Sequence, residues 1–134
     1  MITITKEFLF DAAHKLERQD LSPEENQKIY GKCYRLHGHT FKMHITVSGQ
    51  VDENGMIINF ADLKTLVQSQ IISRYDHNYL NDLPEFKNRP ATVENLIQSV
   101  YERLSPVLND QKLKLQRITV YETPTSFATI EPHA

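Results

Sequence analysis

The sequence CYRLHGHTFKMHITV, residues 33–47, contains the pattern that decides the fold of this chain. From His37 onward apolar and polar side chains alternate, and one parity carries Phe41, Met43, Ile45 and Val47. Successive side chains of a β-strand point to opposite faces of its sheet, so this alternation predicts a strand with one buried face. The polar residues around Gly49 to Gly55 are expected to end that strand.

The N-terminal residues alternate in the same way and predict another strand over residues 2–13. Its apolar parity, broken only by Lys6, carries Ile2, Ile4, Phe8, Phe10 and Ala12. Between the two strands, the sequence Ser22-Pro23-Glu24-Glu25 has the cap, the first-turn proline and the capping-box glutamate of a helix start. Gly31 is expected to end this short helix.

Two further helices are predicted in the middle of the chain. Asn59 is a candidate cap for a helix with one apolar stripe, formed by Leu63, Leu66, Val67 and Ile71. Thr92 is a candidate cap for a second amphipathic helix, which Pro106 is expected to end. Residues 113–122 and 126–131 then predict a closing pair of strands around Pro124.

The order β-β-α-α-β-β predicts one α+β domain over residues 1–134. We expect a four-stranded antiparallel sheet with two helices packed on one face. The 134 residues are 40% hydrophobic and 24% charged, an ordinary globular mixture.

The composition also excludes several classes of protein. A formal net charge of −2 makes nucleic acid an unexpected main partner. A single cysteine excludes an internal disulfide framework. No apolar run approaches a membrane span, and the alternating, charged N-terminus is unlike a signal peptide. We therefore expect a cytoplasmic protein with no membrane partner.

Three histidines are predicted to converge at one end of the sheet. His37 and His39 share the apolar parity of their strand, and His14 shares the apolar parity of the first strand. If these strands pair antiparallel, the end of the first meets the start of the second. Three imidazoles with an open fourth position are a catalytic zinc arrangement. The alternative is three unrelated histidines.

The lone thiol, Cys33, lies four residues before His37 and allows three interpretations. It is a fourth metal ligand, a base or nucleophile beside the cation, or a buried structural thiol. Asp76-His77 places a carboxylate beside an imidazole, which can support proton transfer, although such pairs are commonly solvated turn residues. Glu122 shares the parity of Ile118 and Val120, so it is either an inward carboxylate suited to a planar N–H edge or an edge-strand surface charge.

Six short motifs in order resemble the 6-pyruvoyl-tetrahydropterin synthase family. They are FxAAHxL at 10–16, CxxLHGH at 33–39, GMIxxF at 55–60, DHxxLN at 76–81, TxEN at 92–95 and ET at 122–123. The Cys-x3-His-x-His spacing is more similar to the 6-carboxy-tetrahydropterin synthase branch, because animal-type pyruvoyl synthases typically have a longer gap after the cysteine. The chain has Asn59 where the family usually has aspartate; asparagine caps a helix about as well.

The resemblance implies the T-fold, with subunits closing into a barrel, usually a homohexamer built from two trimers. It implies Zn²⁺ on His14, His37 and His39, holding the side-chain hydroxyls of 7,8-dihydroneopterin triphosphate. It also implies further roles for six residues: Cys33 as the base, His77 oriented by Asp76 as a proton relay, Glu122 as the anchor of the pterin ring, and Thr92 with Glu94 in substrate binding.

The implied activity is that of a zinc-dependent carbon–carbon lyase. It would make 6-carboxy-tetrahydropterin, acetaldehyde and triphosphate on the route to queuosine and related deazapurines. The alternatives are a 6-pyruvoyl-tetrahydropterin synthase of the same fold and a zinc-stabilised binding module without catalysis.

Overall fold

The computed structural model describes residues 1–132. In chain order, its elements are β1 (Thr3–His14), α1 (Pro23–Tyr30), η1 (Gly31–Tyr34), β2 (His37–Gly49), α2 (Phe60–Val67), η2 (Gln68–Ile72), α3 (Ser73–Tyr75), β3 (Asn78–Tyr79), η3 (Leu80–Asp82), η4 (Pro84–Phe86), α4 (Val93–Leu108), β4 (Leu113–Thr123) and β5 (Ser126–Ile130). The π-helical segment η2 joins α2 to α3, so these three form one helical stretch.

The strands form one sheet in the order β3-β1-β2-β4-β5. β1 and β2 pair antiparallel without a register shift, from Thr3 opposite Ser48 to His14 opposite His37. β4 pairs antiparallel with β2 and with β5, and each of these two ladders has one irregularity. β3 lies parallel to β1, opposite Ala12 and Ala13.

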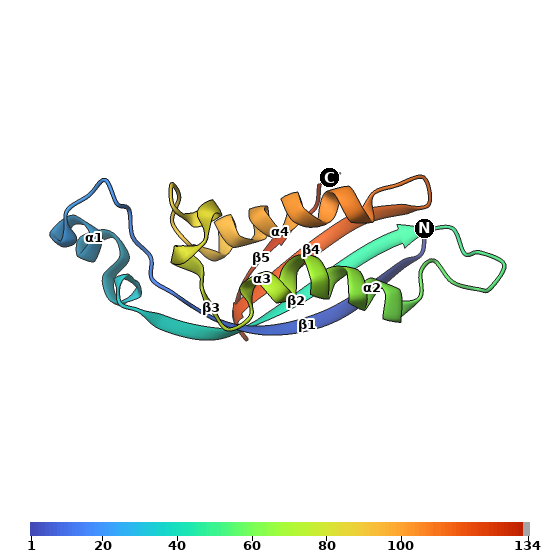
Figure 1. Cartoon of the computed structure of the whole chain (residues 1–134), viewed down its shortest axis with the longest axis horizontal. Helices are drawn as coiled ribbons and strands as arrows, with labels where there is room; N and C mark the ends of the chain where they lie inside the picture. The colour runs from blue at the N-terminus through green and yellow to red at the C-terminus, as the bar shows by residue number, and fades with distance from the viewer. Residues whose placement is uncertain (133–134) are drawn as a thin grey trace.

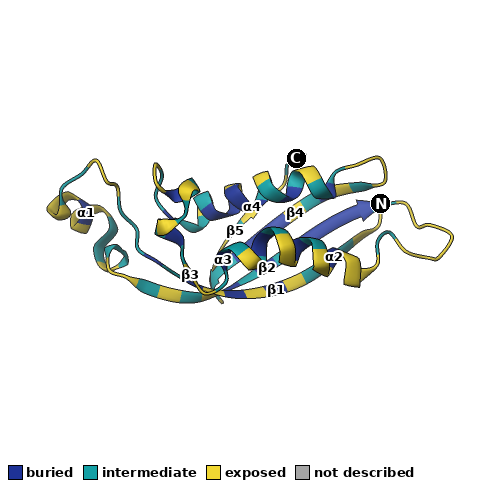
Figure 2. Cartoon of the chain, viewed as in Figure 1, coloured by how far each residue is buried: buried dark blue, intermediate teal, exposed yellow. Residues whose placement is uncertain are grey.

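The helices α2, α3 and α4 cover one face of this sheet, and α1 lies apart at the far end of the β1–β2 hairpin (Figure 1). The core fills the space between the sheet and the helices. Its fully buried side chains include Phe10, Phe41, Leu63, Val100 and Ile118. Figure 2 shows exposed residues along the outer sides of the helices and buried residues on β2 beneath them. Burial on one face explains the alternation in β1 and β2.

The predicted helix caps are confirmed. Ser22 accepts the backbone N–H of Glu25, whose carboxylate accepts the Ser22 backbone N–H in return. Asn59 accepts from the N–H of Ala61, and Thr92 accepts from the N–H of Asn95. Each side chain satisfies a donor that the helix itself leaves free.

Three expectations were wrong. The sheet is five-stranded and mixed, because the two-residue β3 adds to the edge of β1 in a parallel sense. The expected fold class counted only the two helices on the sheet, whereas the structure also contains α1, the short helix that the Ser22–Glu25 sequence predicts. α4 continues past Pro106 to Leu108, since a proline in the last turn removes one hydrogen bond without displacing the buried Leu108.

Within residues 1–132, the structure contains no helix with the length and apolar character needed to cross a bilayer.

Candidate metal centre and its surroundings

His14, His37 and His39 converge on the core-facing side of the sheet, as predicted. The regular β1–β2 ladder sets His14 opposite His37 and Ala12 opposite His39. The ring centroids lie 4.6 Å (His14–His37), 5.2 Å (His14–His39) and 5.0 Å (His37–His39) apart. One nitrogen from each ring lies within 4.8 Å of the other two, so a single ion can contact all three.

Backbone carbonyls orient two of the three rings. Nδ1 of His14 lies 2.7 Å from the carbonyl oxygen of Ala91, and Nδ1 of His37 lies 2.7 Å from that of Arg35. A carbonyl oxygen only accepts, so each Nδ1 carries the proton and each Nε2 carries a lone pair. Metal-binding histidines usually donate their second N–H in this manner.

The buried histidines are neutral at pH 7. Burial lowers the pKa of His14 to about 4, against the opposing effect of its hydrogen bond to Ala91. Burial also lowers the pKa of His39, while the nearby Glu122 carboxylate opposes that shift. A neutral imidazole offers the lone pair that a metal ion requires.

The chemistry of this cluster fits a cation. The Nε2 atoms of His14 and His39 are buried and have no hydrogen-bond partner in the part of the chain that the structure describes. Glu122 projects between them, with Oε2 3.9 Å from Nε2 of His14 and Oε1 3.9 Å from Nε2 of His39. Because neither buried nitrogen makes a hydrogen bond, a bound metal ion would satisfy both of them together with the Glu122 carboxylate.

Cys33 lies near the histidines but outside their cluster. It is half-buried in η1, and its carbonyl accepts the N–H of Leu16 at 2.8 Å, two residues after His14. Among the described residues, the group of ligand atoms within 4.8 Å of one another contains the three histidines and not the Cys33 thiol. This arrangement favours a thiol beside the metal centre over a fourth ligand.

Asp76 and His77 contact each other through their side chains, with Asp76 Oδ2 3.0 Å from His77 Nδ1. Asp11 holds both of them through its backbone: its N–H donates to Asp76 Oδ1 at 2.9 Å, and its carbonyl accepts the N–H of His77 at 2.6 Å. The bond from Asp11, and then His77, lowers the pKa of Asp76. His77 has a φ of 61°, a left-handed conformation that histidine adopts more often than most residues.

This pair lies on the opposite face of the sheet from the metal centre. A pocket of about 550 Å³ is lined by residues 11–13, 38–40 and 77–79. Asp11 and Thr40 hydrogen-bond to each other beside it, and strand alternation turns their side chains away from the face of His14. The side chain of His77 is 78% exposed there.

Thr92 and Glu94 begin α4, just after the Ala91 carbonyl that holds His14. Thr92 is half-buried and caps the helix, while Glu94 is exposed in the first turn. The structure therefore brings them near the end of the sheet that carries the three histidines, and the helix cap gives Thr92 a structural role.

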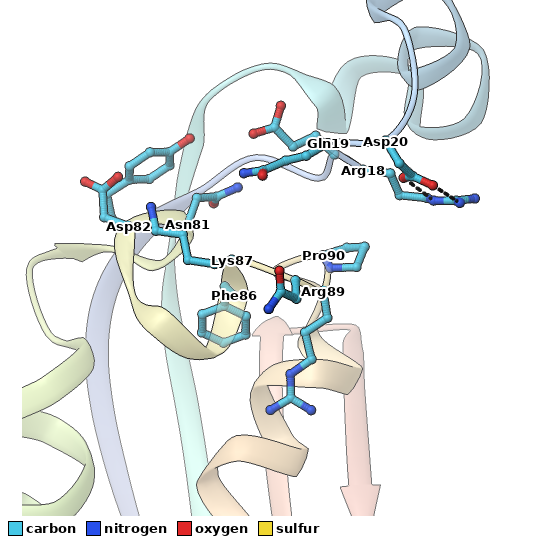
Figure 3. A pocket seen from close by; sticks show the side chains of 12 residues that line it. Arg18, Gln19, Asp20, Asn81, Asp82, Phe86, Lys87, Arg89 and Pro90 are labelled. Atoms are coloured by element: carbon cyan, nitrogen blue, oxygen red, sulfur yellow. Dashed lines mark hydrogen bonds and ion pairs between the residues drawn. The ribbon is translucent and has the colours of Figure 1, made fainter.

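Another pocket, of about 430 Å³, contains none of the predicted site residues. It is lined by residues 17–20, 79, 81–82 and 86–90. Arg18 is paired with Asp20, and Arg89 points away from the loop that carries them (Figure 3). Its cations Arg18, Lys87 and Arg89 are balanced by the carboxylates of Glu17, Asp20 and Asp82, so it offers no excess positive charge to an anion.

Sequence reasoning missed the groups that orient the site. The carbonyls of Ala91 and Arg35 act through the backbone and leave no signal in side-chain type. Asp11 lies on the polar parity of β1, where it resembles an ordinary surface residue. Only the tertiary structure brings it against Asp76, 65 residues away.

The family described as "6-pyruvoyl tetrahydropterin synthase" has a sequence profile that matches residues 3–133. The chain belongs to this family. A 6-pyruvoyl tetrahydrobiopterin synthase from Dictyostelium discoideum is 36% identical over 128 residues, covering 94% of this chain and 93% of that protein. A 6-carboxy-5,6,7,8-tetrahydropterin synthase from Haemophilus influenzae is 32% identical, covering 95% of this chain and 96% of that protein.

The fold of the family is also present in a solved relative. The structure of the Caenorhabditis elegans 6-pyruvoyl tetrahydropterin synthase matches with a TM-score of 0.87 and 32% identity, covering 97% of this chain and 94% of that one. The recognition made from the six motifs is confirmed, and with it the α+β T-fold class.

Proposed function

We propose that this protein is a zinc-dependent 6-carboxy-5,6,7,8-tetrahydropterin synthase. It would convert 7,8-dihydroneopterin triphosphate to 6-carboxy-tetrahydropterin, acetaldehyde and triphosphate in the biosynthesis of queuosine and related 7-deazapurines. Membership of a synthase family supports an enzyme, and a cytoplasmic location agrees with that role. The observation that carries the proposal is the cluster of His14, His37 and His39, whose free lone pairs face a common point.

The branch within the family is proposed on the spacing of one motif. Cys33 precedes His37 by four residues, the spacing of the carboxy branch, and a relative with that name aligns along most of the chain. The names of the Dictyostelium and Caenorhabditis relatives favour the second candidate, a 6-pyruvoyl-tetrahydropterin synthase.

The proposed mechanism assigns one task to each group. The Nε2 atoms of His14 and His37, with a ring nitrogen of His39, would hold Zn²⁺, which supplies Lewis-acid chemistry to the hydroxyls of the substrate side chain. Cys33, close by but outside the ligand cluster, would remove a proton of that side chain, which binding to the metal would make acidic. Glu122 would anchor the pterin ring through its amino and ring N–H groups, and Thr92 with Glu94 would line the substrate site.

The relay by Asp76 and His77 requires a second subunit. Their pair lies on the face of the sheet opposite the metal centre, so within one chain it does not meet the substrate of Cys33. Among residues 1–132, the sheet also has two open edges, since β3 covers only the end of β1 at Ala12 and Ala13, and β5 pairs with no strand other than β4. Pairing of such edges between copies would close a ring and bring the two groups together, in agreement with a homohexamer.

Mass spectrometry of the products from 7,8-dihydroneopterin triphosphate tests the proposal. We expect 6-carboxy-tetrahydropterin, with acetaldehyde and triphosphate in equal amounts. A 6-pyruvoyl product without acetaldehyde would establish the second candidate. If the zinc-loaded protein does not consume the substrate, both synthase activities are wrong.

Removal of the metal distinguishes the proposed enzyme from a non-catalytic binding module that zinc stabilises. Chelation of a structural metal should unfold the chain, because such sites contribute directly to folding. We expect the chelated protein to remain folded by circular dichroism and to lose turnover, with recovery when zinc is returned.

A further inference from the structure

Glu122 has a position that pterin anchoring alone does not explain. It follows Tyr121, the last β4 residue paired with β2, and shares the inward parity of Val120. Its two carboxylate oxygens each approach a different histidine of the cluster, at 3.9 Å from the Nε2 atoms of His14 and His39. Three adjacent strands, β1, β2 and β4, therefore contribute side chains to one point.

The groups that meet there can each donate an electron pair to a cation. His14 uses its Nδ1 hydrogen on Ala91, so its Nε2 presents a lone pair to the carboxylate. Glu122 is 24% exposed, which leaves it access to solvent, yet it lies 3.9 Å from two buried nitrogens that make no hydrogen bond within the described residues. Such an arrangement is stable when a cation lies between these groups.

The spacing brings Glu122 close to coordination distance, although it is not yet within the ligand group of the three histidines. Zinc bonds of about 2.0–2.1 Å to nitrogen and to oxygen put neighbouring ligand atoms of a tetrahedral site about 3.4 Å apart. The observed 3.9 Å separations of Glu122 from His14 and His39 differ from that value by about 0.5 Å. Because Oε1 and Oε2 approach different histidines, and Glu122 lies outside the group of ligand atoms within 4.8 Å of one another, binding of one oxygen to the ion requires the side chain to turn further toward the cluster.

We propose that Glu122 is the fourth ligand of the metal centre in the substrate-free protein and that a pterin ring draws it off the metal. The inference rests on the zinc site of the proposed function. A ligand with a planar edge of N–H donors can replace the metal ion as the partner of the Glu122 carboxylate. The position that Glu122 vacates is then open to a hydroxyl of the substrate side chain, so recognition of the ring prepares the metal for the reaction.

The test uses Co²⁺ in place of zinc, because its visible absorption reports the number and type of ligands. Metal-free protein is titrated with Co²⁺ for the wild type, Glu122→Gln, Glu102→Gln and His37→Ala, and folding is checked by thermal melting. Glu102 is exposed on α4 and provides the matched carboxylate control. We expect Glu122→Gln to weaken Co²⁺ binding by about 10–100-fold and to change the spectrum, with Glu102→Gln unchanged.

A second arm needs no variant. Unsubstituted pterin has the N–H edge but no side-chain hydroxyls, so it can remove Glu122 without ligating the metal through a side chain. We expect it to change the Co²⁺ spectrum of the wild type toward that of Glu122→Gln, with its binding followed by its own fluorescence. Bound pterin that leaves the spectrum unaltered would overturn the proposal.

The titration also separates this inference from the proposed function. If His37→Ala loses the metal while Glu122→Gln keeps the wild-type affinity and spectrum, the Glu122 assignment alone is wrong. If both variants bind Co²⁺ like the wild type, the metal centre itself is wrong.

Discussion

The carboxylate of Glu85 is expected to contribute one of the largest single terms to the stability of this fold. It accepts two hydrogen bonds from the guanidinium of Arg74, at 2.7 and 2.5 Å, and one from the hydroxyl of Tyr75 at 2.8 Å. Arg103 of α4 lies 3.6 Å away, and the Glu85 side chain is only 10% exposed. Since Arg74 and Tyr75 directly precede the Asp76–His77 pair, this cluster also fixes the start of that segment.

The hydrogen bonds from Arg74 lower the pKa of Glu85 from 4.5 to about 2. The depressed value means that the carboxylate stabilises the folded state above the unfolded pKa, and that this stability is lost as the pH falls from 4.5 toward 2. A difference of about 2.5 pKa units corresponds to about 3 kcal/mol. Glutamine resembles the protonated acid, so Glu85→Gln should cost about 3 kcal/mol at pH 7 and only about 1 kcal/mol at pH 3.

Urea unfolding of the wild type and Glu85→Gln at a series of pH values measures this gap. Glu102→Gln, at an exposed carboxylate, serves as the control and should stay within about 0.5 kcal/mol of the wild type. A gap that is absent at pH 7, or one that stays constant down to pH 3, would refute the assignment of the low pKa to Glu85.

Three further predictions concern the thiol, a helix cap and the assembly. Cys33→Ala should keep its zinc and its melting temperature but lose about 10²–10⁴-fold in turnover, because it lacks the general base. Loss of zinc would show that Cys33 is a metal ligand, and full activity would show that it is only a buried structural thiol. Asn59→Ala should cost about 1 kcal/mol in urea unfolding because it removes the acceptor for the Ala61 N–H, whereas Asn59→Asp should be neutral; equal stability of all three proteins would contradict the cap. Light scattering should find an oligomer, and a stable, active monomer would contradict the closure of the open β1 and β5 edges.

Much of the sheet could be predicted because alternation is a local property. The strands over residues 2–13, 113–122 and 126–131 and the strand from His37 were confirmed nearly to their ends. β1, β2 and β4 contribute buried side chains to the core, and β5 packs Ala128 and Ile130 partly buried against it. β3 could not be predicted, because two residues carry no period and its pairing depends on contacts made by Asp11. The predicted end of α4 at Pro106 was wrong because the burial of Leu108 outweighs the local effect of the proline.

The metal cluster was predictable for the same reason as the strands. Their positions in the alternation of each strand predicted that His14, His37 and His39 lie on the same face of the sheet. Antiparallel pairing of the two strands predicted that they lie at the same end. The distance of Cys33 from them was not predictable, because a turn without periodicity sets it. The face occupied by Asp76 also escaped prediction, since it is fixed by a backbone hydrogen bond from a distant strand.

The most direct test of the central claim is the zinc content of the purified protein and of the single variants His14→Ala, His37→Ala and His39→Ala, measured by elemental analysis on folded samples. Each chain of the wild type should carry one zinc ion, and each variant should lose it, because the three lone pairs face a common point. Full retention of zinc by all three variants would contradict the claim that these histidines form the metal centre.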